Sequence, residues 1–137
     1  MLYEFCAENV TLLEKAMQAG ARRIELCDNL TVGGTTPSYG VIRAAVDLAK
    51  PYETSIMTMI RPRGGNFVYT DLEVAIMIED IKKAREAGSQ GVVYGLLTRE
   101  NELDTENLES LLAVSKDLEV VFHMAFDSIP RDKQFEA

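Results

Sequence analysis

Short apolar runs of strand type alternate along the chain with longer segments that carry apolar residues three and four positions apart, the spacing of an amphipathic helix. The runs predict strands at residues 2–6, 23–27, 55–60, 91–95 and 119–123. Helices are predicted after the first four strands, at about 10–19, 36–49, 70–88 and 105–112. This alternation describes a parallel sheet wound by right-handed crossovers.

The third predicted helix has the clearest boundaries. Thr70 is a good N-cap, and Glu73 follows it at the position that completes a capping box. Apolar residues then recur at helical spacing until Gly88, which is suited to end the helix.

The pattern favours a barrel over an open dinucleotide-binding sheet. A dinucleotide fold needs a Gly-x-Gly-x-x-Gly turn after its first strand, whereas residues 7–9 of this chain contain no glycine. Polar residues instead recur at the carboxyl ends of successive strands, as in a TIM (β/α)8 barrel. We therefore predict an α/β fold with a single barrel domain over residues 1–137. A full barrel needs roughly 200 to 250 residues, so we expect about five βα units of a C-terminally incomplete barrel, either a fragment of a longer protein or one whose open side is covered by something else.

Composition and charge exclude several classes of partner. The chain has 22 acidic and 14 basic residues, a formal charge of -8 and no cluster of four or more lysines or arginines, so nucleic acid and anionic membranes are poor partners. No apolar run approaches the ~20 residues of a membrane span, and the N-terminus lacks the pattern of a signal peptide. These features predict a cytoplasmic protein whose two cysteines are reduced thiols.

The segment 57–65 joins an apolar strand to a cationic loop that contains Arg61, Arg63, Gly64 and Gly65. Arginine binds oxyanions with two parallel hydrogen bonds, and glycine exposes the backbone. These four residues are therefore candidates for holding a small anionic substrate. The predicted helix amino terminus after Thr36 would add its dipole.

Alternation of side chains along the strands brings further polar groups toward the same place. Glu4 shares a face with Cys6, and Glu25 shares the corresponding face with Cys27. Large apolar residues should face the helices, which leaves both pairs inside the barrel. Arg61, which follows the third strand, and His123, the only histidine, should lie with them at one end of the barrel.

These charges also allow a purely structural interpretation. Glu4 and Glu25 would then neutralise Arg61 and Arg63 and close the barrel top, with Arg23 as a second structural partner.

Two ligands suit the predicted site. Cys6 and Cys27, on adjacent strands about 5 Å apart at the backbone, suit Cu(I), which prefers Cys and Met ligands. A small phosphate or carboxylate suits the arginine loop instead. In that case His123, with a glutamate or Asp127, would supply the acid and base of an enzyme.

At these residues the sequence resembles the CutC family, the so-called copper homeostasis proteins. The matching segments span the whole chain and are Arg-Ile-Glu-Leu-Cys at 23–27, Gly-Gly-Thr-Thr-Pro-Ser-Tyr-Gly at 33–40, Ile-Arg-Pro-Arg-Gly-Gly-Asn-Phe-Val-Tyr at 60–69, and Phe-His-Met-Ala-Phe-Asp at 122–127.

The resemblance implies a cytoplasmic TIM barrel that is commonly a homo-oligomer, longer than this chain, in which Cys6 and Cys27 match the two cysteines proposed to bind copper. The family usually has arginine after the histidine, whereas this chain has Met124. That change would weaken an anion site and would not impair a copper site. The leading prediction is therefore Cu(I) binding through the two thiols for copper tolerance or trafficking. The alternative is an enzyme that acts on a small anionic substrate, with Glu4 and Glu25 orienting His123.

Overall fold

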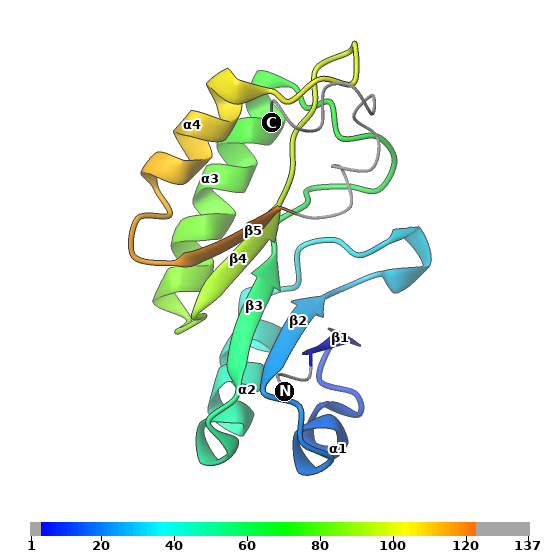
Figure 1. Cartoon of the computed structure of the whole chain (residues 1–137), viewed down its shortest axis with the longest axis vertical. Coiled ribbons are helices and arrows are strands. Elements are labelled where there is room, and N and C mark those ends of the chain that lie inside the picture. Colours follow the sequence, from blue (N-terminus) through cyan, green and yellow to red (C-terminus); the bar gives the residue numbers. More distant parts are fainter. Residues whose placement is uncertain (1–3, 123–137) are drawn as a thin grey trace.

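The computed structural model describes residues 4–122. Five parallel strands form one sheet in the order β1-β2-β3-β4-β5, and a helix follows each of the first four (Figure 1). The strands are β1 (Glu4–Glu8), β2 (Arg23–Cys27), β3 (Ser55–Met59), β4 (Gly91–Tyr94) and β5 (Glu119–Phe122). The helices are α1 (Leu13–Gln18), α2 (Tyr39–Ala49), α3 (Asp71–Glu86) and α4 (Thr105–Ala113), with short 3-10 helices η1 (Leu30–Val32) and η2 (Lys50–Tyr52).

The main core lies between the sheet and the helices, because the strands turn their large apolar residues that way. In β2, Ile24 and Leu26 are fully buried and belong to one cluster with Ile42 of α2 and Ile81 of α3. Figure 1 shows α3 and α4 side by side along β4 and β5, with α2 beside β3. Burial of this continuous apolar layer stabilises the sheet.

The opposite, inner face of the sheet carries a smaller buried cluster of Cys27, Met57, Met59 and Val93. Gly91 makes room for it, since a Cβ atom there would lie 2.4 Å from Cε of Met57. An inner layer of side chains from successive strands is what fills a TIM-type barrel.

The predicted fold class is therefore confirmed: the chain has the alternating strands and helices of a TIM-type barrel. Within residues 4–122 the sheet is not closed, and β1 and β5 are its two edges. None of the helices in this range has the length and apolar character needed to cross a membrane.

The start of the chain differs from the prediction. β1 continues to Glu8, where a turn was expected, and α1 begins at Leu13 rather than near residue 10. Asn9 and Leu12 have φ angles of 59° and 62°, and a left-handed residue cannot continue a right-handed helix.

The capping box of α3 is confirmed. Oγ1 of Thr70 accepts a hydrogen bond from the backbone N–H of Glu73 at 3.1 Å, and Oε1 of Glu73 accepts one from the backbone N–H of Thr70 at 2.9 Å.

Candidate functional site

Arg23 bridges two carboxylates at the amino end of the inner face. Its Nε lies 3.0 Å from Oε1 of Glu4 on β1, and its Nη1 lies 2.9 Å from Oε1 of Glu119 on β5. Arg23 is thus a structural ion-pair partner, as the sequence suggested. Because Glu4 lies opposite Arg23 in the strand register, it lies at the other end of the strands from Arg61, and the expected convergence does not include it.

Cys6, Glu25 and Cys27 form a thiol–carboxylate cluster on the inner face. The register places Cys6 opposite Glu25 and Cys27 opposite Glu8, so the two cysteines are offset by two positions along their strands. Sγ of Cys6 lies 3.5 Å from Oε2 of Glu25, and Sγ of Cys27 lies 3.6 Å from the carbonyl oxygen of Ala7. The sulfur of Cys27 therefore leans toward the strand that carries Cys6.

Burial and acidic neighbours keep both thiols protonated. Burial, followed in order of importance by the charges of Cys6, Glu8, Asp28 and Glu25, raises the pKa of Cys27 to about 11. Burial, followed by the charge and hydrogen bond of Glu25, raises the pKa of Cys6. Only the thiolate is a strong nucleophile, so these pKa shifts disfavour nucleophilic attack by either thiol at neutral pH. Its negative potential suits a cation.

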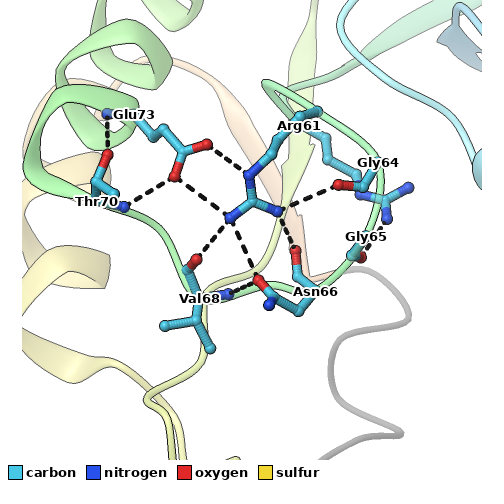
Figure 2. Close-up of polar contacts among 8 residues, drawn as sticks. Arg61, Gly64, Gly65, Asn66, Val68, Thr70 and Glu73 are labelled. Carbon is cyan, nitrogen blue, oxygen red and sulfur yellow. Dashed lines mark hydrogen bonds and ion pairs between the residues drawn. The ribbon is translucent and has the colours of Figure 1, made fainter.

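Arg63 is held by its own loop and by α3. Its Nε lies 2.6 Å from Oε2 of Glu73, while its Nη atoms donate to the carbonyl oxygens of Gly64, Asn66 and Val68 at 3.2, 2.9 and 2.7 Å. Figure 2 shows these four acceptors gathered around one guanidinium. All three nitrogens of Arg63 thus have protein acceptors, which favours a structural role.

Arg61 is buried, with 3% of its surface exposed. Nη1 donates to the carbonyl oxygens of Val32 at 2.6 Å and Gly34 at 3.0 Å, and Nη2 donates to that of Gly65 at 2.8 Å. Its guanidinium lies 5.0 Å from the centre of the Phe67 ring. The structural interpretation in which Glu4 and Glu25 neutralise Arg61 and Arg63 is therefore not observed, because each group has other partners.

The loops that follow β2 and β3 are joined through these contacts. Thr36 and Arg61 exchange backbone and side-chain hydrogen bonds at 2.8 to 3.2 Å. A Cβ atom on Gly64 would lie 3.0 Å from Cβ of Val32, and Gly65 has a φ of 91°. Of the two glycines predicted as anion contacts, Gly64 thus has a steric reason to be glycine and Gly65 a conformational one.

Several predicted residues lie outside the described part of the chain. They are His123, Asp127 and Met124. Their proposed acid–base and anion roles stay predictions.

Three acidic residues of the site were not predicted from the sequence. Glu8 lies near Cys27, Glu73 pairs with Arg63, and Glu119 pairs with Arg23. Glu8 was assigned to a turn, although its position two residues after Cys6 continues the inward alternation. Glu73 was used only as part of a helix cap. Within residues 4–122 no group of three or more His, Cys, Asp or Glu side chains is arranged to hold a metal ion, so a metal here would rely on the two thiols.

Comparisons with known proteins show which sequences and structures this chain is similar to. The sequence model of the CutC family matches residues 1–135. A CutC family protein of Streptococcus pyogenes serotype M6 is 59% identical over the 137 residues, which cover 66% of that relative. The crystal structure of CutC from Streptococcus agalactiae has a TM-score of 0.95 and 54% identity, over 99% of this chain and 65% of that one. A human relative named copper homeostasis protein cutC homolog is 42% identical, and the match covers 93% of this chain and 46% of that protein. The chain thus spans less than two thirds of the length of these relatives.

Proposed function

This chain belongs to the CutC family, and we propose that it binds Cu(I) through Cys6 and Cys27 in the service of copper homeostasis. The observation that carries the proposal is the thiol–carboxylate cluster, in which two cysteines share the inner face of neighbouring strands. The name of the human relative agrees with this role.

The donor set of this cluster fits a soft monovalent cation. Thiolate and thioether sulfur are the ligands that select Cu(I), and the thioether of Met59 lies in the same buried cluster as Cys27. Cys6 and Cys27 would hold the ion, and binding would release their protons. Met59 is available as a further soft neighbour.

The surrounding charges favour a cation over an anion. Glu25 lies against Cys6, and Glu8 and Asp28 act on Cys27. Carboxylates that raise the pKa of a thiol by repelling its thiolate would attract a bound cation by the same field. The acidic neighbours therefore support copper rather than a phosphate or carboxylate at this position.

A competition titration tests the proposal. The intact protein is titrated with Cu(I) under reducing conditions against a chromophoric chelator, beside the Cys6→Ser/Cys27→Ser variant. The wild type should retain about one equivalent, because two sulfur ligands define one site, and the double variant should retain none. Equal behaviour of the two proteins would remove the thiols from the proposal.

Two matched pairs of variants test whether Met59 and Glu25, which lie near the two thiols, contribute to copper binding. Met59→Leu should weaken Cu(I) retention, whereas Met77→Leu should not, because Met77 is also buried but lies in the main core. Glu25→Gln should likewise weaken retention through loss of its charge, whereas Glu106→Gln, on the exposed surface of α4, should leave it unchanged.

The alternative function, an enzyme that acts on a small anionic substrate, depends on Arg61, Arg63, Gly64 and Gly65. Arg63 could bind such a substrate only by giving up its contacts with Glu73 and the loop carbonyls. The geometry therefore supports Cu(I) binding better than this reaction.

A further inference from the structure

The guanidinium of Arg61 is a buried positive charge that forms no ion pair with a carboxylate in residues 4–122. Its acceptors are the backbone carbonyls of Val32, Gly34 and Gly65, which carry only partial negative charge. The ring of Phe67 offers a weak electrostatic contact and no counter-charge. A cation removed from water without a counter-charge is strongly unfavourable.

Two buried donors beside this charge have no hydrogen-bond partner of regular geometry in the described part of the chain. They are Nε of Arg61 and the hydroxyl of Tyr69. Tyr69 is 8% exposed, and the guanidinium of Arg63 lies 5.0 Å from the centre of its ring. Buried donors are almost always paired in native proteins, so two donors that have no regular acceptor and lie beside each other need an explanation.

The hydroxyl of Tyr69 lies within electrostatic reach of both arginines. Burial raises its pKa, whereas the positive charges of Arg61 and Arg63 and a hydrogen-bonding approach of the Arg61 side chain act in the opposite direction. The two donors are therefore close to each other, although the contact between them lacks the geometry of a regular hydrogen bond. The hydroxyl is therefore a donor at neutral pH, and its surroundings are positive.

The charge balance of the loop points to what is missing. Arg61 and Arg63 contribute two positive charges, and Glu73 contributes one negative charge through its ion pair with Arg63. The surplus is one positive charge, and it lies on the residue whose Nε–H has no acceptor of regular geometry. A group that supplies both an acceptor oxygen and a negative charge would satisfy the two requirements together.

We propose that the loop of residues 61–69 binds a small oxyanion, a carboxylate or a phosphate, whose oxygens accept hydrogen bonds from Nε of Arg61 and the hydroxyl of Tyr69. Both donors are shielded from solvent, so uptake requires a displacement of the loop. This site lies apart from the thiol–carboxylate cluster and does not depend on copper binding.

Thermal melting of the intact protein tests the proposal. Wild type and Tyr69→Phe are melted in increasing sodium phosphate, sodium acetate or sodium chloride at matched ionic strength. The melting temperature of wild type should rise saturably with phosphate, acetate or both, and not with chloride. Tyr69→Phe, which keeps the ring, should weaken the apparent affinity about tenfold or more, as for a lost hydrogen bond to a charged group.

Tyr39→Phe is the matched control, because the Tyr39 side chain is exposed beside Lys83 on the helical surface. It should respond to the anions as wild type does. With chloride alone, Tyr69→Phe should melt close to wild type, since its hydroxyl then loses only a contact of poor geometry with Arg61.

The possible outcomes separate cleanly. A response to phosphate alone or acetate alone assigns the anion to that class, and a response to both supports the shared oxyanion chemistry. A rise that chloride reproduces, an unchanged affinity in Tyr69→Phe, or a Tyr69→Phe variant that melts well below wild type in chloride would each overturn the proposal.

Discussion

Arg63 organises the loop that leads into α3, and Arg63→Lys should destabilise the protein although it preserves the charge. The guanidinium contacts three backbone carbonyls and Glu73 at the same time. A lysine ammonium is a single point on a flexible stem and cannot reproduce that planar fork. The substitution therefore separates hydrogen-bond geometry from charge.

The expected loss is about 2 kcal/mol. Lysine can retain the interaction with Glu73 and one carbonyl, which leaves two carbonyl contacts unmade, at about 1 kcal/mol each. This value lies below the ~1.5–3 kcal/mol of hydrogen bonds to charged groups, because the Arg63 side chain is 36% exposed and water replaces part of what is lost. No energy is assigned to the ion pair, since both residues can form it.

Urea unfolding of wild type and Arg63→Lys measures this difference directly. Arg99→Lys is the matched control, because Arg99 is exposed and takes part in no described ion pair, and its unfolding free energy should stay within about 0.5 kcal/mol of wild type. If Arg63→Lys also stays within that margin, the loop does not depend on the fork of Arg63 and the argument is refuted.

Three further predictions concern single positions. The Cys27 thiol, whose pKa is raised to about 11, should react with iodoacetamide slowly at pH 8 in the native protein and faster as the pH rises toward 11, because the thiolate fraction grows; a native rate equal to that of the unfolded protein at pH 8 would contradict this. Gly91→Ala should cost about 1–3 kcal/mol by overpacking, because the new Cβ would lie 2.4 Å from Cε of Met57 and 2.5 Å from the backbone oxygen of Glu119. In the same urea experiment, Gly40→Ala, where a Cβ meets nothing closer than 4.0 Å in α2, should be neutral or stabilising. Thr70→Ala should lower the unfolding free energy by about 1 kcal/mol through loss of the α3 cap, and an unchanged value would mean that the capping box adds nothing.

The strands and their two faces could be predicted from the sequence because they depend on local pattern. The apolar run at 23–27 and its alternation were sufficient to turn Cys27 inward and Ile24 toward the helices. The capping box at Thr70 depends on two residues close in sequence, and it was likewise predictable.

The partners of the charged residues could not be predicted, because they depend on register and on loop conformation. A shift of one residue between β1 and β2 would have placed a different residue opposite Cys6, and only the structure gives Glu25 there. Arg23 reaches Glu119 across the inner face, a contact between residues 96 positions apart that no local pattern indicates.

The predicted start of the first helix was wrong for a related reason. Asn9 and Leu12 adopt left-handed backbone conformations, which helical spacing of apolar residues does not reveal. That spacing suggested a helix from about residue 10, and the chain instead extends β1 and turns twice before α1 begins.

The loops after β2 and β3 are fastened to each other by Arg61, Thr36 and the close approach of Gly64 to Val32. Surface loops usually accept insertions and sequence drift, but neither of these two can lengthen without parting from the other. Insertions should therefore be tolerated better in other loops at the carboxyl ends of the strands. One such loop is the stretch between β4 and α4, where residues 99–102 are exposed. A library of random insertions scored for soluble expression would map this difference along the chain.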